Sequence, residues 1–360
     1  MIKRLDIYII KKFLSTFFFM IGAFVMVAIV FDINENLTEL LQSKATGWQI
    51  ITEYYLNFAL YFGTLLSSFI IFLTIIWFTS KLAQNTEVIA MLSGGISYAR
   101  IMRPYFISAA ILVGCMLLLS HVIVPRANRV KYDFEVNYLK GALTVSEYNM
   151  HRETEPGTIA YFSSYTPERH GGNDFSLEKW HDGKLTWKLI SSGATINPET
   201  QLWSLDKVQI RTFDTQGHEQ LLIKQQLDTM LNISEEVFAL RAEIASAMTW
   251  RELNDFINRQ KLGGSGRVAQ FELEKYNRTA GPFAIFVLTL IGVSIASRKQ
   301  RGGIGLHLML AIVIGFIFIF ISRITAVSAM SLGFSAALAV WVPNALFALL
   351  GFWLYGRAQK

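Results

Sequence analysis

Long uncharged apolar segments, separated by short polar ones, occupy the first and last thirds of the chain. Residues 13–31 and 54–80 contain no charged side chain. A helix needs about 20 mainly apolar residues to cross a bilayer, so each segment is predicted to be a membrane-spanning helix. Four further segments meet the same description, at residues 105–125, 279–297, 302–322 and 333–356.

The middle of the chain, from Arg126 to about Leu240, has a different pattern. Short apolar runs alternate there with polar residues, and turn-forming residues separate them. Residues 175–181, the pair Asp182-Gly183 and residues 184–190 predict a β-hairpin. Several short strands with regular turns are typical of a β-sandwich or jelly-roll-like domain. Helical spacing returns after this region, at residues 249–261 and 268–277.

The predicted fold is therefore an α-helical membrane protein with six transmembrane helices and an inserted β-sandwich or jelly-roll domain. The predicted boundaries divide the chain into four parts. Residues 1–125 hold transmembrane helices 1–3, residues 126–245 the β domain, residues 246–277 a helical connector, and residues 278–360 transmembrane helices 4–6.

The distribution of positive charge predicts the orientation. The sequence is 17% charged, below the roughly 25% of soluble proteins, and its net charge is +6. Lysine and arginine collect in the cytoplasmic loops of membrane proteins. The two short loops on the predicted outer side contribute only Lys44 and Arg323, whereas both termini and two loops share the other positions: Lys3, Arg4, Lys11, Lys12, Lys81, Arg100, Arg103, Arg298, Lys299, Arg301, Arg357 and Lys360. Both termini are thus predicted to be cytoplasmic and the β domain to lie outside.

No motif in the sequence predicts catalysis. There is no G-x-x-x-x-G-K-[ST] phosphate loop, no G-x-S-x-G, no H-E-x-x-H and no C-x-x-C. The single cysteine, Cys115, lies within an apolar segment, and the six histidines lack ligand spacing on one element. We therefore expect no catalytic residue, no metal site and no cofactor.

The loop between the second and third apolar segments holds a predicted short helix at residues 86–93. Asn85 is a suitable N-cap, Glu87 lies in the first turn, and Gly94-Gly95 would end the helix. One face is apolar, formed by Val88, Met91 and Leu92. A helix of two turns is not stable alone in water, so we expect this face to dock on another protein.

The order of elements, together with T-E-V-I-A-M-L-S-G-G at residues 86–95, resembles the LptF/LptG (YjgP/YjgQ) permease family of lipopolysaccharide export. Further similarity lies at Tyr8-Ile9 before the first span, at residues 127–129 after the third, and in the polar helix 267–277 that leads into the fourth. The resemblance covers essentially the whole chain. Its most specific part is the element order combined with residues 86–95.

The resemblance implies a transport function in the bacterial inner membrane. Two permease subunits would enclose a cavity for lipopolysaccharide, LptB-like ATPase subunits would bind and hydrolyse ATP below them, and the periplasmic β domain would meet an LptC/LptA-like bridge protein. The helix at 86–93 would be the coupling helix. In this interpretation Glu87 faces a basic residue of the ATPase, and Val88, Met91 and Leu92 form the apolar part of the contact.

One region departs from the family pattern. Family members often carry basic residues near the outer end of the first span, where lipid phosphates can bind. Here that region contains Asp32, Asn34, Glu35 and Glu39. The lipid phosphates could be neutralised in three ways. Divalent cations could bridge them to the acidic residues, or the partner subunit could supply positive charge. Alternatively, arginines of this chain could bind the phosphates, and the candidate lipid-binding residues are Arg323, Arg126 and Arg129. Interfacial anchoring is the alternative for Arg126 and Arg129, and an internal ion pair is the alternative for Arg323.

A second function agrees with the same pattern. The chain could be a mechanotransmission or scaffold protein that senses an ATPase through the short helix but carries no lipid. Six long apolar helices favour a cavity over a simple anchor. Glycolipid that co-purifies with the protein would distinguish the transporter from the transmitter.

Overall fold

The computed structural model describes residues 3–139, 147–166, 169–197, 200–213, 218–231, 233, 244–262, 267–298 and 303–358. The chain divides into two compact units. The first, here called the membrane unit, contains Met1–Tyr138, Ser246–Arg251 and Ala269–Lys360. The second, here called the β unit, contains Leu139–Ala245 and Glu252–Val268.

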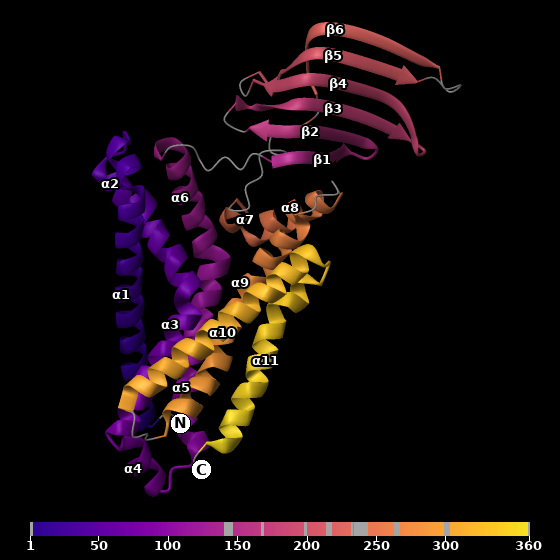
Figure 1. Ribbon diagram of the computed structural model, residues 1–360. Coiled ribbons are helices and arrows are strands. Elements are labelled where there is room, and N and C mark those ends of the chain that lie inside the picture. The colour runs from indigo at the N-terminus through magenta and orange to yellow at the C-terminus, as the bar shows by residue number, and fades with distance from the viewer. Residues whose placement is uncertain are drawn as a thin grey trace. The chain divides into compact units, whose positions relative to one another are not determined.

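Among the described residues, six helices of the membrane unit are long and apolar enough to cross a bilayer, which confirms the six predicted spans. Two of them contain a single wider π-helical turn. The spans are α1 (Arg4–Gln42); α2 (Gly47–Gln49) with η1 (Ile50–Tyr55) and α3 (Leu56–Gln84); α5 (Tyr98–Leu118) with η2 (Leu119–Ile123) and α6 (Val124–Tyr138); α9 (Val268–Ala296); α10 (Gly303–Ser331); and α11 (Ala336–Arg357). The short helix α4 (Glu87–Ser93) lies at the end of the helix bundle that also holds both termini (Figure 1).

The third span extends further than the sequence pattern predicted. Instead of ending at residue 125, the helix continues to Tyr138 and is 41 residues long. At 1.5 Å per residue this is about 60 Å, twice the hydrocarbon thickness, so α6 projects beyond the membrane. Pro125 is accepted inside the helix because it follows η2, where the wider turn already interrupts the regular hydrogen bonding. The first described strand begins only at Glu147.

Helix α3 is the centre of the membrane unit. Its side chains contribute to two apolar cores, one with α1, α5 and α9 and the other with α9, α10 and α11. Close approach of α3 and α9 depends on Gly292, where a Cβ atom would lie 2.8 Å from the Cγ2 of Ile75. Such a distance requires a neighbour to move, so the glycine is needed for this packing.

Gly292→Val is expected to destabilise the membrane unit by about 1–3 kcal/mol, because it overpacks a filled interface. Gly114→Val is the matched control, since no atom outside its own helix backbone lies within 4 Å of a Cβ built at Gly114. Thermal unfolding of the purified protein in detergent measures the difference. Equal melting temperatures for the two variants would show that the α3–α9 interface yields to the added side chain.

The described strands of the β unit form one antiparallel sheet in which each strand pairs with its neighbours in sequence. The strands are β1 (Glu147–Glu155), β2 (Thr158–Thr166), β3 (Gly171–His181), β4 (Lys184–Ile196), β5 (Trp203–Phe213) and β6 (Glu219–Thr229). The predicted hairpin is present between β3 and β4. Asp182 and Gly183 both have positive φ, at 49° and 75°, as a type I′ turn requires.

The core of the β unit lies on one face of this sheet. Phe162, Phe175, Trp203 and Leu205 are fully buried there, and the rings of Phe175 and Trp203 are stacked at 6.0 Å. Alternating side chains of β2, β3, β4 and β5 supply the buried positions. The structure thus confirms a helical membrane protein with an inserted β domain. Helices α7 (Ile244–Ala247) and α8 (Trp250–Leu262) follow the strands, and α8 matches the first helix predicted after them.

Candidate functional site

Helix α4 begins abruptly after α3. Asn85 is not its N-cap, contrary to the sequence prediction, because the Asn85 N–H still donates to Lys81 and so belongs to the end of α3. Thr86 turns the chain instead, with a φ of 60° in the left-handed region. The predicted C-terminus is confirmed: Gly95 has a φ of 79°, and the Ile96 N–H donates to the carbonyl of Met91.

The apolar face of α4 turns towards its own chain. Val88 is 2% exposed and belongs to the core formed with α1, α3 and α5. Met91 and Leu92 are partly buried against this core. Ile89 is 41% exposed. The sequence reasoning correctly found an amphipathic helix but did not consider that the same molecule would cover its apolar side.

Glu87 stands at the start of α4 and meets the first turns of α1. The Tyr8 hydroxyl donates to Glu87 Oε2 at 3.1 Å. Lys12 in turn donates to the Tyr8 hydroxyl at 2.6 Å and lies over the Tyr8 ring. A carboxylate can accept about four hydrogen bonds, so Glu87 keeps acceptor capacity for a further donor.

An ion pair that buries the Asp6 carboxylate involves a residue that follows α4 in the sequence. Arg100, in the first turn of α5, donates from both guanidinium nitrogens to the two carboxylate oxygens of Asp6, each at 2.6 Å. The side chain of Asp6 is 3% exposed, and the Lys3 backbone N–H also donates to it. Sequence reasoning missed this pair, since the two residues are 94 positions apart and no local spacing connects them.

The three candidate lipid-binding arginines lie on two helices, Arg323 on α10 and both Arg126 and Arg129 on α6. Arg323 lies inside α10 rather than in a loop between two spans, because α10 continues to Ser331. It is exposed and makes no ion pair among the described residues. Arg126 and Arg129 are exposed on α6, and Arg129 donates to the carbonyl of Ala247 at 3.5 Å.

The acidic region near the C-terminal end of α1 is partly paired within the chain. The Tyr54 hydroxyl donates to Asp32 at 3.3 Å. Tyr54 lies in the π-helical turn η1 and also meets Lys131 of α6, whose ammonium is 5.6 Å from the ring centroid. Asp32 therefore accepts a hydrogen bond from tyrosine, and no described arginine forms an ion pair with it.

Arg278 is a further residue that sequence reasoning missed. It is 5% exposed, and it donates to Glu274 at 3.1 Å and to the carbonyl of Met248 at 2.7 Å. These contacts attach the polar start of α9 to residues 246–251. The spacing of Glu274 and Arg278, four positions apart on one helix, was the available clue.

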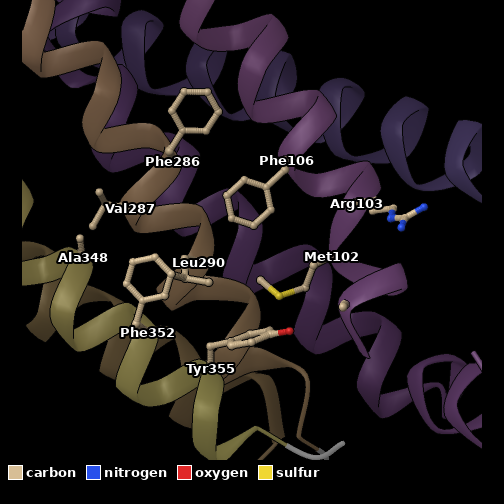
Figure 2. A pocket seen from close by; sticks show the side chains of 10 residues that line it. Met102, Arg103, Phe106, Phe286, Val287, Leu290, Ala348, Phe352 and Tyr355 are labelled. Carbon is tan, nitrogen blue, oxygen red and sulfur yellow. The ribbon is translucent and has the colours of Figure 1, made fainter. Parts of the chain in front are cut away.

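An apolar groove of about 470 Å³ lies among α5, α9 and α11 (Figure 2). Phe106, Phe286 and Phe352 line it, and the Arg103 side chain extends away from it (Figure 2). Its remaining lining is Ala99, Met102, Val287, Leu290, Ala348 and Tyr355. Apart from the Tyr355 hydroxyl and Arg103, this lining is apolar and suits hydrocarbon.

The β unit has a second, more polar hollow on its sheet. It contains Glu178, whose carboxylate is 2.7 Å from the ammonium of Lys188. Burial opposes ionisation of Glu178, but the hydrogen bonds from Lys188 and Trp180 outweigh it and lower the pKa of this carboxyl. Among the described residues, no group of three histidine, cysteine or acidic side chains is placed to hold a metal ion.

Comparison with protein families matches residues 7–357 to the lipopolysaccharide export system permease LptF/LptG. The chain belongs to this family. No individual curated protein matches it. The match includes nearly all of the chain, so α4, the six spans and the β unit all lie within the region that defines an LptF/LptG permease. The family is a non-catalytic component of the lipopolysaccharide transporter, and its apolar helices indicate a multi-pass protein of the inner membrane.

Proposed function

We propose that this LptF/LptG permease extracts lipopolysaccharide from the inner membrane and passes it to a periplasmic bridge, driven by a separate ATPase subunit. The observation that carries the proposal is the family match over residues 7–357, on a chain with six spans and a β unit. The chain itself acts without a catalytic group or cofactor, and ATP is bound by the LptB-like partner.

The proposed dock for the ATPase is the outward side of α4. Glu87 supplies the charge, and Ile89 at 41% exposure supplies apolar contact area. Met91 and Leu92 border this surface, whereas Val88 supports it from inside. This assignment differs from the pattern-based one only in the apolar residue that faces the partner.

A second permease subunit is proposed to pair through the apolar sides of α1 and α10. Few side chains of these two helices are covered by the rest of the chain. Phe19 and Phe31 of α1 are 75% and 70% exposed, and Phe316 and Phe320 of α10 are 61% and 65% exposed. Such surfaces suit a neighbouring helix, the acyl chains of the transported lipid, or both in turn.

The periplasmic bridge is proposed to continue the sheet at β6. Among the described strands, β6 pairs on one side only, with β5, so its other edge offers unpaired backbone groups. Leu221, Leu222 and Ile223 on this strand are all more than half exposed. A long apolar edge strand is a template for strand addition, which is how an LptC/LptA-like protein would join it.

The proposed orientation places both termini and α4 in the cytoplasm, and it can be tested by cysteine labelling. In a Cys115→Ser background, cysteine at Lys184 on β4 is expected to react with an impermeant thiol reagent in cells with a permeable outer membrane. Cysteine at Arg4 is expected to stay unlabelled until the inner membrane is opened. The reverse pattern would invert the topology.

Arg323 is predicted to bind a lipid phosphate or the paired subunit. Arg323→Ala should leave expression near normal but weaken lipid retention or subunit association roughly fivefold, since one such charge near an anionic surface contributes about 1 kcal/mol. Arg323→Lys keeps the charge and is the matched control. Unchanged lipid content, assembly and export in Arg323→Ala would reduce this residue to an interfacial anchor.

The proposed function is tested by purifying the chain with its native partners and identifying the proteins and lipids by mass spectrometry. A transporter should bring lipopolysaccharide, and the complex in proteoliposomes should release it to a bridge protein only with ATP. ATP-dependent conformational change without bound or released glycolipid would instead identify a mechanotransmission protein.

A further inference from the structure

The cytoplasmic end of α1 is packed very differently from the rest of this helix. Its buried residues are Asp6, Ile9, Phe13 and Phe17, all in the first four turns. Beyond them the side chains are largely open, with Leu41 near the outer end at 77% exposure. Helix α1 is therefore held at its base.

The contacts at this base lie on both sides of α4. At the first residue of α4, Tyr8 donates to Glu87 at 3.1 Å. After α4, Arg100 forms its bidentate pair with Asp6. Between these points Ile9 and Val88 belong to the same apolar core. The base of α1 thus bonds to the first residue of the coupling helix and to Arg100 of the following helix α5, and it shares an apolar core with the buried side of α4.

We propose that Tyr8, Asp6 and Arg100 are positioning residues that transmit a displacement of α4 to α1. The proposal rests on the proposed function, in which the ATPase docks on α4. A charged bidentate pair resists sliding and rotation better than apolar contact alone, because both of its hydrogen bonds depend on direction.

The geometry of α1 allows it to carry a displacement from its base to its outer end. It is a single helix of 39 residues, and its sequence contains no proline that would kink it. At 1.5 Å per residue its length is about 58 Å, so a rotation at the base moves the outer end by a larger distance. Beyond Phe17 the side chains of α1 are largely exposed, and near its outer end the Tyr54 hydroxyl donates to Asp32 at 3.3 Å.

Glu87 has a double role in this arrangement. Its Oε2 accepts from Tyr8, and the other carboxylate oxygen has only Asn85 at 3.5 Å among the described residues. A basic group of the ATPase can bind this oxygen while Tyr8 keeps its own hydrogen bond. One carboxylate would then join the partner to α1 directly.

The test uses the full complex with its ATPase, in proteoliposomes with lipopolysaccharide and a bridge protein. Spin labels at Leu41 on α1 and Val136 on α6, in a Cys115→Ser background, report the movement of α1 when a non-hydrolysable ATP analogue binds. Lipid released per ATP hydrolysed reports the coupling. The variants are Tyr8→Phe and Asp6→Asn, with Lys11→Gln as the control, since Lys11 is exposed on the same turns and takes no part in these contacts.

Both variants are expected to retain the ATPase subunit and its hydrolysis. Lipid released per ATP should fall roughly 2- to 30-fold, the range for residues that carry coupling between sites, and the nucleotide-dependent distance change should shrink. Tyr8→Phe removes one hydroxyl and preserves the ring, so it remains informative if Asp6→Asn fails to fold. Wild-type coupling and a wild-type distance change in Tyr8→Phe, or in a folded Asp6→Asn, would refute the proposal that these contacts transmit the displacement of α4 to α1.

Glu87→Lys, measured in the same series, separates this outcome from failure of the proposed function. If the ATPase does not dock on α4, Glu87→Lys will retain the ATPase. The proposed transmission from α4 to α1 then loses its premise. If α4 is the dock but α1 is not driven through these contacts, Glu87→Lys will lose the ATPase while Tyr8→Phe and Asp6→Asn behave as wild type.

Discussion

Glu87→Lys is expected to abolish co-purification of the ATPase subunit while the chain still inserts and folds. A charge-assisted hydrogen bond contributes about 1.5–3 kcal/mol, which corresponds to roughly 10- to 150-fold in affinity. Lysine would not only remove this contact but also place a like charge opposite the basic group of the partner. It would further add a cation beside Tyr8 and Lys12, whose ammonium is 2.6 Å from the Tyr8 hydroxyl.

The substitution series at Glu87 distinguishes docking from helix capping. A carboxylate that only interacts with the helix dipole contributes about 0.3–1 kcal/mol, and the loss of so little would leave the complex working. We therefore expect Glu87→Asp to be mild, Glu87→Ala to weaken docking or uncouple hydrolysis, and Glu87→Lys to be most severe. Glu35→Lys is the control, because Glu35 is an exposed carboxylate at the other end of α1. Normal ATPase recovery and lipid release with Glu87→Lys would refute the assignment of α4 as the dock.

Trp203→Ala is expected to unfold the β unit and stop export. Trp203 is fully buried, and it stacks on Phe175 and lies 6.2 Å from Phe162 between ring centroids. Removing a buried aromatic side chain of this size costs about 3–5 kcal/mol, because the remaining cavity collapses only in part. This is a large fraction of the 5–15 kcal/mol that typically stabilises a domain.

Trp180→Ala provides the matched control for this second prediction. Trp180 is in the same sheet but is 40% exposed, so its loss should change stability by much less. Limited proteolysis of the intact protein measures the effect: cleavage within residues 147–229 should accelerate in Trp203→Ala, while the membrane helices remain protected. Equal proteolysis of the two variants would mean that the sheet core does not depend on Trp203.

The spans and the hairpin were predictable because the responsible signals are local. An uncharged segment of about 20 residues is a sufficient reason to cross a bilayer, whatever its neighbours. Likewise, Asp182-Gly183 specifies a type I′ turn through the left-handed conformations that these two residues accept. The glycine pair after α4 ended the helix as predicted for the same reason.

Local signals failed where two interpretations had the same pattern. The change from an apolar to a polar pattern at Arg126 placed the end of the third span at residue 125, but the helix continues to Tyr138. Arg323 was taken as a break between spans, yet it lies within α10 as an exposed residue. In both cases the backbone geometry of the neighbouring residues decided where the helix ends, and the preference of a single residue could not.

By itself, the sequence determined the number of spans, the position and C-terminal end of α4, the inserted β unit and the resemblance to the LptF/LptG family. Only the tertiary structure decided which side of α4 is free, since Val88 is covered by α1, α3 and α5. It also decided the partners of Glu87 and Arg100, which lie 79 and 94 positions from Tyr8 and Asp6. Hydrophobic periodicity reports how one helix meets its surroundings. Directional contacts between distant side chains exist only once the helices are packed together, and no local spacing encodes them.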